Sequence, residues 1–375
     1  MSDRDALLAA VRADPDNDLP RLVYADWLEE HDEERQAAFI RAEVALARLE
    51  PNDDDIEATA EQASVLWRDD GRAWRIPGLS GLQVPRRGLI EVVETSAEAL
   101  IAVPPEVLLR YPIRRLRLVT ADEYIDELLR LPIWSTVESL ILNNNLMGTR
   151  ERISRLFNEA DFGKLHELSM QNNRLWPEAM EMLLNSPVMP NLAHLNLSGN
   201  PIGTAGLEQL AASPHAAGLR ELILRSDELP YSECIHAAGA MALAASTSLS
   251  HLRTLNLAGH SVGDAGAIDI ARSLTAGRLL DLDLSFNDLG SLGDTAYEDL
   301  TNPLYLPNLR KLNLAGNTLN GLAAEAILRE WAVGLSSIDL RECRFEGYAL
   351  ERLIPAARAG RILLDEEHLS SGSQT

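Results

Sequence analysis

The sequence of 375 residues predicts an α/β protein built from stacked strand–helix units, and three observations lead to this fold class. One pattern of apolar residues recurs at nearly constant spacing along most of the chain, and helix-forming residues follow most of its copies. Apolar residues make up 46% of the chain but aromatic residues only 5%, so the apolar content is mainly aliphatic, which suits many small, similar layers. A chain of this length is expected to form one long array or two domains.

The repeated pattern has an apolar residue at positions 0, 3, 5 and 10 of each unit and usually Asn at position 8. Eight copies start at Val137, Leu165, Leu192, Leu219, Leu252, Leu279, Leu309 and Leu335. Successive starts are 28, 27, 27, 33, 27, 30 and 26 residues apart, which is too regular for chance. Upstream, Ile113, Leu116 and Leu118 resemble a degraded copy, and residues 89–93 an opening strand.

The spacing has a physical reason. Positions 3 and 5 alternate, so both face inward from a short strand. Burying a Leu side chain contributes roughly 1.5–3 kcal/mol, but only stacked neighbours can bury the leucines of one unit. The Asn at position 8 can satisfy backbone groups where the chain leaves the strand. Asp227, His260 and Cys343 occupy this position in three units, and there we expect the role to be altered or absent.

Helices are expected after the strands, for example over residues 204–212, 264–274, 322–331 and 347–357. The segments 202–207 and 262–267 match position for position. Over about residues 113–365 the pattern resembles the ribonuclease-inhibitor-like class of leucine-rich repeats. This resemblance implies a right-handed solenoid, or horseshoe, with a concave parallel β-sheet and convex helices. It is specific for the fold and says little about a partner.

A small all-helical module is predicted before the repeats. Residues 1–50 indicate three helices, and another follows Asp53–Asp55. The strings LPRLVYADWLEEH at 19–31 and AFIRAE at 38–43 closely resemble the bacterial repeat-companion domain, a module that typically precedes leucine-rich repeats and has no assigned activity. The expected organisation is a helical repeat-companion module at 1–70, a cap with a degenerate first repeat at 71–118, leucine-rich repeats at 119–365 and a disordered tail at 366–375.

The charge of the chain is strongly negative and uneven. The formal net charge is −23 and the pI about 4.7, which disfavours nucleic-acid phosphates and anionic membranes and favours basic partners. Residues 1–70 hold 20 Asp and Glu against 7 Arg, a net of −13. Residues 72–118 hold 8 Arg against 4 Glu, a net of +4. We expect the acidic helical module to dock against its basic cap; an anion-binding patch is the alternative.

Other features indicate a soluble protein of a reducing compartment. Cys234 and Cys343 are more than a hundred residues apart and form no disulfide framework. The N-terminus does not resemble a signal peptide, and no run of about 18 apolar residues is present to span a bilayer. We expect a cytoplasmic monomer that uses no cofactor or metal and binds neither nucleic acid nor membrane.

One segment resembles a catalytic motif. Gly259–Gly263 matches the G-x-S-x-G turn of serine hydrolases, which also lies between a strand and a helix. The repeat explains every position in it except Ser261 itself, because His260 falls on the Asn position and Val262 on buried position 10. We therefore interpret the match as a product of the repeat, and a serine hydrolase at Ser261 stays an unfavoured alternative.

Two further groups of residues have side chains that could take part in catalysis or metal binding. Asp281 and Asp283 point the same way from one strand and could hold a divalent metal with a phosphate, but polar residues are expected at outward strand positions anyway. Cys234 and His236 lie in the enlarged unit between Leu229 and Leu252, where a half-buried cysteine is favoured over a nucleophile. The sequence assigns no catalytic residue and no metal ligand, so the protein is not expected to be an enzyme.

The expected function is a non-catalytic scaffold or receptor that binds a protein or peptide on the concave face. Positions 2, 4 and 6 face outward there, and they carry five acidic and three basic residues, a net of −2. A mixed-charge ligand is therefore expected. The partner-binding candidates are Ile141, Gln171, Asn196, Ile223, Arg225, Asn256, Asp281, Asp283, Phe286, Asn313, Asp339 and Arg341. A GTPase-activating protein is the second hypothesis, since some such activators are acidic solenoids of this repeat class.

Overall fold

The computed structural model describes residues 2–50, 52–226, 229–273, 276–290, 295–329 and 335–370. The chain divides into two compact units. Unit 1 comprises Met1–Leu142 and Glu159–Leu165, and unit 2 comprises Asn143–Asn158 and His166–Thr375. The finer division at residues 70, 118 and 365 that the sequence suggested stays a prediction.

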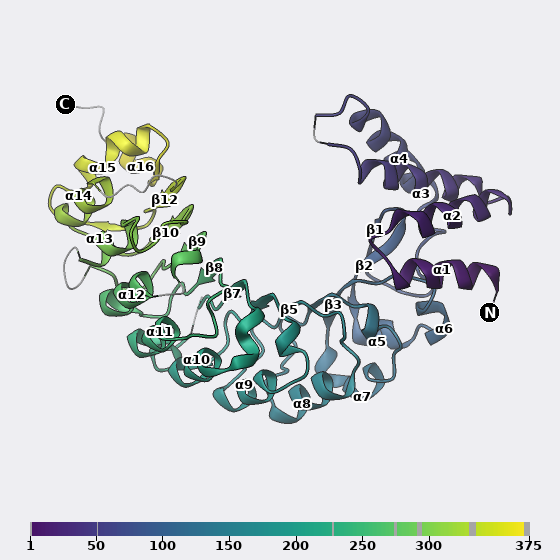
Figure 1. Cartoon of the computed structure of the whole chain (residues 1–375), viewed down its shortest axis with the longest axis horizontal. Helices are drawn as coiled ribbons and strands as arrows, with labels where there is room; N and C mark the ends of the chain where they lie inside the picture. The colour runs from purple at the N-terminus through teal and green to yellow at the C-terminus, as the bar shows by residue number, and fades with distance from the viewer. Residues whose placement is uncertain are drawn as a thin grey trace. The chain divides into compact units, whose positions relative to one another are not determined.

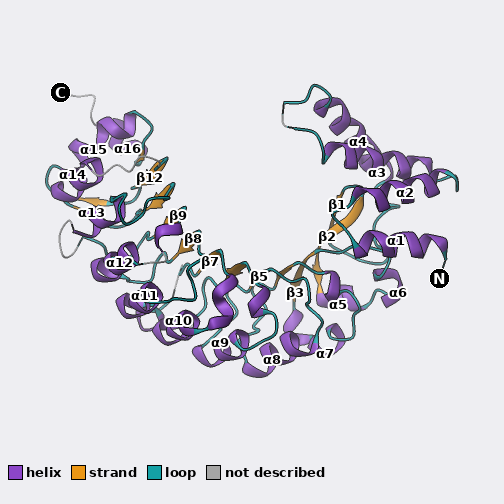
Figure 2. Ribbon diagram, viewed as in Figure 1, coloured by secondary structure: helices purple, strands orange, loops and turns teal. Residues whose placement is uncertain are grey.

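Unit 1 consists of four N-terminal helices followed by a sheet in the order β1-β2-β3-β4 (Figures 1 and 2). β1 is antiparallel to β2, and the other strands are parallel. The four helices are α1 Asp3–Ala13, α2 Asp18–Glu29, α3 Glu34–Leu46 and α4 Ile56–Asp70. The strands are β1 Leu82–Arg86, β2 Leu89–Ser96, β3 Arg115–Val119 and β4 Ser139–Ile141. Short helices are α5 Ala97–Ile101, α6 Pro105–Leu108 and α7 Ile125–Leu128.

The helix starts follow from local chemistry. Ser2 and Asp5 form a reciprocal capping box at the start of α1, and the side chain of Asn17 accepts a hydrogen bond from the Leu19 N–H at the start of α2. The four predicted helices are thus confirmed. The hairpin of β1 and β2 was only half predicted, because the sequence indicated an opening strand at 89–93 and not its antiparallel partner.

The second string of the repeat-companion resemblance holds the turn of this hairpin. Arg87 and Gly88 form the turn in left-handed conformation, with φ of 47° and 83°. A Cβ atom on Gly88 would lie 2.4 Å from the Cα of Ile40, so only glycine allows this close approach. Glu43 accepts hydrogen bonds from the backbone N–H groups of both turn residues, and its burial raises the pKa of its carboxyl group.

The first string supplies a buried ion pair to the same hairpin. Arg21 of α2 is fully buried, and its Nη2 donates to the Pro15 carbonyl oxygen at 2.8 Å and to a carboxylate oxygen of Glu91 in β2. Burial raises the pKa of Glu91 and lowers that of Arg21, while their mutual attraction opposes both shifts. Nearby, Arg114 pairs with Asp16 at 2.9 Å. This pair, like that of Arg110 with Asp5, joins an acidic N-terminal residue to a basic residue of segment 72–118, as the charge pattern suggested, whereas the buried pair has the opposite polarity.

The buried ion pair gives a stability prediction. Arg21→Leu leaves the Glu91 carboxylate buried beside fewer cations, and we expect it to lower the free energy of unfolding by about 3–5 kcal/mol. Adding Glu91→Leu should recover most of this loss, because two Arg21 nitrogens have no hydrogen-bond partner in the described structure. Urea denaturation followed by circular dichroism measures both. The exposed Arg35→Leu is the control and should cost under about 1 kcal/mol; an equal effect there would contradict the prediction.

Unit 2 carries a parallel sheet in the order β5-β6-β7-β8-β9-β10-β12-β14, with helices along one side of it (Figure 2). Its strands are β5 Glu167–Ser169, β6 His194–Asn196, β7 Glu221–Ile223, β8 Thr254–Asn256, β9 Asp281–Asp283, β10 Lys311–Asn313, β12 Ser337–Asp339 and β14 Ile362–Leu363. A small second sheet pairs β11 Thr318–Leu319 with β13 Arg344–Phe345.

The helices of the repeats agree closely with the predicted ranges. They are α8 Arg150–Glu159, α9 Pro177–Leu184, α10 Gly203–Ala212, α11 His236–Ala244, α12 Gly263–Arg272, α13 Thr295–Thr301, α14 Gly321–Arg329, α15 Ala349–Arg358 and α16 Glu366–Ser370. Residues 274 and 331, the predicted ends of two of them, lie outside the described residues. Residues 366–370, expected in a disordered tail, instead form α16, where the His368 ring contacts the Phe345 ring edge-on at 5.4 Å.

The apolar pattern is buried as predicted. In all eight leucine-rich repeats the residues at positions 3 and 5 are at most 2% exposed. Position 10 differs in two repeats: Phe345 of the last repeat is only half buried, and the enlarged repeat needs a correction. Leu229 is only half buried, whereas Ile235 is fully buried and precedes α11 as Ile202 precedes α10. The six extra residues of this unit therefore lie between the strand and position 10, and Ile235 rather than Leu229 fills that position.

Buried asparagines join successive units into a ladder. The Oδ1 of Asn200 accepts hydrogen bonds from the N–H groups of Asn173 and Leu175 in the preceding unit, at 2.8 and 3.0 Å. Its Nδ2 donates to the Met170 and Leu197 carbonyl oxygens at 2.7 and 2.8 Å. Asn287 and Asn317 repeat both halves of this pattern. One side chain thus satisfies buried backbone groups of two neighbouring repeats.

The ladder predicts a large effect of one truncation. Asn287→Ala removes the acceptor for the His260 and Val262 N–H groups and the donor to the Leu257 carbonyl oxygen. Because buried unpaired groups cost about 1–3 kcal/mol each, we expect the free energy of unfolding to fall by more than 2 kcal/mol. Thermal and urea denaturation measure this. The exposed Asn308→Ala, which loses one hydrogen bond to Gly277, should cost about 1 kcal/mol or less. Comparable losses in the two variants would disprove the ladder's importance.

Candidate functional site: the open face of the unit 2 sheet

Eleven of the twelve partner-binding candidates lie in unit 2, on the strands or just after them, and Ile141 lies at the end of β4 in unit 1. We call the side of the β5–β14 sheet that is turned away from the helices the sheet face (Figure 2). Because the strands are paired in register, the same template position lines up across neighbouring units. The central row, at position 4, consists of Ser169, Asn196, Ile223, Asn256, Asp283, Asn313 and Asp339.

Most polar members of the central row have a structural role that the sequence analysis missed. In five units the position-4 side-chain oxygen accepts a hydrogen bond from the backbone N–H two residues later, at 2.9–3.1 Å. The five side chains are those of Asn196, Asn256, Asp283, Asn313 and Asp339. The recurrence of Asn or Asp at position 4 was the available signal, since short side chains of this type bond to nearby backbone groups. These residues shape the strand exit as well as the surface.

Asp283 is the most heavily engaged member of the row. One oxygen accepts hydrogen bonds from Asn256 and Asn313 at 3.1 and 3.0 Å, and the other accepts from the N–H and hydroxyl of Ser285. The neighbouring Asp281 is 3.9 Å from Lys311, and burial is the main factor raising the pKa of its carboxyl group. Among the described residues no cluster of three or more His, Cys, Asp or Glu could hold a metal ion. The arrangement is that of a hydrogen-bonded surface.

The exposed members of the candidate set are Phe286, Arg225 and Arg341. Phe286 is 48% exposed, and a Cβ atom on Gly316 would lie 2.2 Å from its ring, so glycine in the next unit lets the ring lie flat. Arg341 is held by a two-oxygen ion pair with Asp339, which raises the pKa of Arg341 and lowers that of Asp339 against the effect of burial. Such pre-positioned aromatic and Arg side chains are the usual anchors of protein interfaces.

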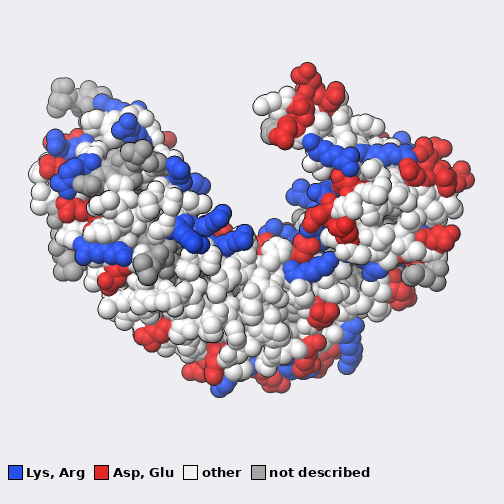
Figure 3. All heavy atoms as spheres, in the orientation of Figure 1, with Lys and Arg blue, Asp and Glu red and all other residues white. Residues whose placement is uncertain are grey.

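The strand-exit side of unit 2 also exposes aromatic residues that were not in the predicted set. Trp176 is 47% exposed just before α9, and Tyr231, in the enlarged unit, is 72% exposed. The repeat pattern did not predict their exposure, because neither residue occupies an outward strand position. Figure 3 shows charge gathered unevenly, with acidic side chains over the N-terminal helices and a largely uncharged surface over α9 to α11.

His260 performs an altered form of the ladder role. It occupies the Asn position of its unit, and its Nδ1 accepts a hydrogen bond from the Ile235 N–H at 3.3 Å while its Nε2 bonds to the Leu224 carbonyl oxygen. The ring therefore joins its own repeat to the preceding one, but it accepts one backbone N–H hydrogen bond where Asn200 accepts two, so the expected alteration of this role at His260 is confirmed. This pairing requires the neutral ring, and burial lowers its pKa to about 4.

The same geometry removes the support for the hydrolase alternative. Both nitrogens of His260 are bonded to backbone groups, so the residue beside Ser261 cannot act as its general base. The two cysteines are also unsuited to catalysis. Burial raises the pKa of Cys343 to about 12 and is the main factor raising that of Cys234, which keeps both thiols protonated.

Cys343 retains only part of the ladder role. Its Sγ donates to the Leu314 carbonyl oxygen at 3.3 Å, as an asparagine Nδ2 would, but a thiol is a poor acceptor for the backbone N–H groups of the preceding unit. The expected alteration at Cys343 is therefore confirmed. Asp227, the third exception, lies outside the described residues.

Comparisons with known proteins agree with this architecture. Three segments, residues 188–211, 248–271 and 305–328, match the family described as Leucine Rich repeat. Together with the parallel sheet flanked by helices, these matches give the chain a leucine-rich-repeat type of α/β fold. In the described part of the chain, no helix combines the length and apolar character needed to cross a bilayer.

Several solved structures are similar to the chain at low identity. A chain of the yeast Rad7–Elc1 complex has 15% identity and a TM-score of 0.44, over 92% of this chain and 95% of that one. An internalin from Listeria monocytogenes has 13% identity and a TM-score of 0.40, over 72% and 70%. A leucine-rich repeat protein from Bacteroides eggerthii has 14% identity and a TM-score of 0.31, over 68% and 44%.

The low pKa of His260 predicts a pH-dependent stability. Between about pH 6.5 and 4 the unfolded chain binds a proton at this site and the folded chain does not, so stability falls as pH falls through this window. Between pH 7 and 4, we expect the free energy of unfolding to fall by roughly 2–3 kcal/mol less in His260→Asn than in the native protein. Urea denaturation at each pH measures this. The exposed His251→Asn serves as the control, and a native-like pH dependence of His260→Asn would refute the assignment.

Proposed function

We propose that this protein is a non-catalytic scaffold or receptor that binds a protein or peptide of mixed charge on the sheet face of unit 2. The observation that carries the proposal is the continuous, half-exposed row of side chains that the in-register strands present. A parallel sheet is usually covered on both faces, so one left open by its helices offers a broad binding surface. The same fold typically acts by binding proteins.

The proposed contacts divide into two groups. Asn196, Asn256, Asp283, Asn313 and Asp339 already bond to their own backbone, so they offer a preset polar surface. Ile223, Arg225, Phe286 and Arg341 present apolar and cationic groups that a partner would bury; Ile141, Gln171 and Asp281 complete the set. Rigid positioning lowers the entropy lost on binding, which favours affinity. No cofactor, metal, nucleic acid or membrane enters this proposal.

The setting of this activity is proposed from the sequence. The strings at 19–31 and 38–43 support a bacterial protein with an N-terminal repeat-companion module. Cys234 and Cys343 are free thiols, which supports a reducing cytoplasm. We propose that the protein acts there as a monomer.

The proposal predicts that sheet-face variants lose partners without losing the fold. Phe286→Ala and Arg225→Glu should each weaken binding by at least 2 kcal/mol if their side chains are central anchors, about thirtyfold in Kd. Affinity purification of the tagged full chain followed by mass spectrometry identifies captured proteins, and titration of the purified candidate gives Kd. The control is Arg358→Glu, an exposed charge reversal on α15. Partners captured equally by all variants would show that binding occurs elsewhere.

A further inference from the structure

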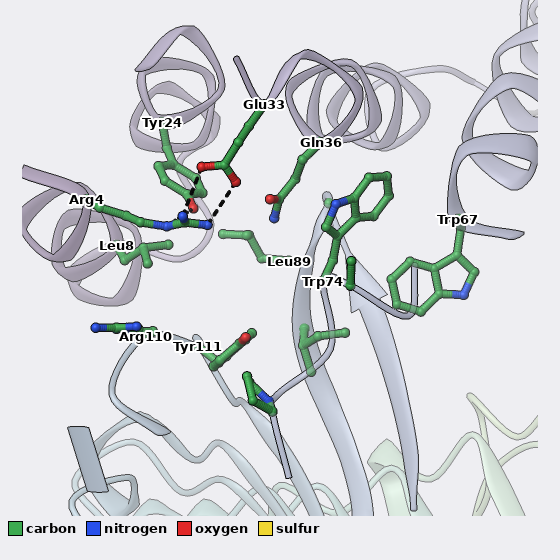
Figure 4. A pocket seen from close by; sticks show the side chains of 14 residues that line it. Arg4, Leu8, Tyr24, Glu33, Gln36, Trp67, Trp74, Leu89, Arg110 and Tyr111 are labelled. Atoms are coloured by element: carbon green, nitrogen blue, oxygen red, sulfur yellow. Dashed lines mark hydrogen bonds and ion pairs between the residues drawn. The ribbon is translucent and has the colours of Figure 1, made fainter. Parts of the chain in front are cut away.

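Unit 1 contains a cavity of about 360 Å³ between the N-terminal helices and strand β2. Every residue that lines it belongs to Met1–Leu142, so the cavity is built within one unit. Figure 4 shows side chains from α1, α2, α3 and α4 converging on it together with Leu89 and Tyr111. A volume of this size is at the lower end of the range for ligand sites, which is about 300–1,000 Å³.

The side chain of Gln36 identifies the cavity as more than a packing gap. Gln36 is 9% exposed, points into the cavity (Figure 4), and has no hydrogen-bond partner in the described part of the chain. Buried polar side chains are almost always paired, because otherwise they lose their hydrogen bonds to water. Its carboxamide offers an acceptor and two donors to an occupant.

The walls around this amide are aromatic and held in place. Trp74 stacks on Phe39 with ring centroids 5.0 Å apart, and Trp67 stacks on the same ring at 5.6 Å. The Tyr111 hydroxyl donates to the Arg75 carbonyl oxygen at 3.0 Å, and the Tyr24 hydroxyl accepts from Arg4 at 3.1 Å. The tyrosine hydroxyls are therefore engaged, and the walls offer mainly ring faces to an apolar group.

The charged residues of the lining are already neutralised. Arg4 donates to both carboxylate oxygens of Glu33, at 3.0 and 3.3 Å, and Arg110 lies 3.3 Å from Asp5. A phosphate or carboxylate would have to compete with these pairs. An uncharged occupant avoids this cost, and its polar part must match Gln36.

We propose that this cavity binds a peptide segment of a partner protein, with one large apolar side chain between the aromatic rings and the adjoining main-chain amide paired with Gln36. A peptide group carries one donor and one acceptor, which complement a carboxamide, and it is covalently joined to the apolar group that the walls require. Aromatic pockets of this kind receive the anchor residues of protein partners. The site is separate from the sheet face of unit 2 and does not depend on the function proposed there.

The test uses the full chain labelled with 5-fluorotryptophan, with fluorine NMR signals assigned by Trp→Phe variants. The probes are N-acetyl-L-tryptophanamide, which has an indole ring and two amides, and 3-methylindole, which has the ring alone. We expect saturable shifts at Trp67 and Trp74 and none at Trp134 or Trp176. The amide probe should bind about tenfold more tightly than the ring alone. No saturable shift at Trp67 or Trp74 overturns the proposal.

Variants of Gln36 then isolate the amide contact. Gln36→Met keeps the length of the side chain and removes the amide, so binding of the amide probe should weaken about tenfold while binding of 3-methylindole stays unchanged. The Tm of the free protein should change little, since the Gln36 side chain makes no hydrogen bond in the described part of the chain. Gln36→Leu is a second variant should the first fold poorly, and the exposed Gln62→Leu on α4 is the matched control. The peptide assignment would be overturned if the native protein and the variants bound both probes equally. Adenosine is a third probe, with an aromatic ring and no peptide group, and tighter binding of adenosine than of the amide probe would also overturn the assignment.

Discussion

Each leucine-rich unit buries the backbone of the bend that follows its strand, and the polar groups of that bend must find partners inside the protein. The asparagine at position 8 meets this constraint with one side chain, because its oxygen serves the preceding unit and its nitrogen serves carbonyl groups of two units. Burial of leucines alone would hold units together without fixing their register, since apolar attraction has no direction. The hydrogen bonds of Asn200, Asn287 and Asn317 supply that direction. His260 shows that the requirement is for a donor and an acceptor at one place rather than for asparagine itself.

Because their register is fixed, the short strands together form one continuous surface. Position 4 of one unit lies beside position 4 of the next, so Asp283 can bond to Asn256 on one side and Asn313 on the other. Polar side chains that are tied to one another and to the backbone stay ordered without a partner, which suits a surface that recognises shape and charge with little loss of entropy. The exposed Phe286 and Arg225 offer a partner an apolar ring and a cation.

In unit 1, the two sequence strings that resemble the repeat-companion domain contain residues with a structural role. Arg21, Ile40 and Glu43 of the two repeat-companion strings all contact the β1–β2 hairpin, through an ion pair, close packing and two backbone hydrogen bonds. The module therefore completes the first hairpin of the sheet. In the described structure, its fold leaves the Gln36 side chain without a hydrogen-bond partner at the cavity, where the amide of an occupant could bond to it.

The sequence by itself determined the fold class, the start of each repeat, the buried leucines and the helices that follow the strands, because a period of about 27 residues forces like positions into like environments. It also placed the sheet-face candidates on one side of the strands, since strand side chains alternate. Only the tertiary structure decided that Ile235 replaces Leu229, that His260 continues the ladder, and that Asp283 is bonded while Phe286 is exposed. The cavity around Gln36 was equally hidden, since its walls come from α1, α3, α4 and β2. The period shows which positions of the repeats are equivalent, but it does not show which segments far apart in the sequence come into contact. Those contacts depend on the folded path of the chain.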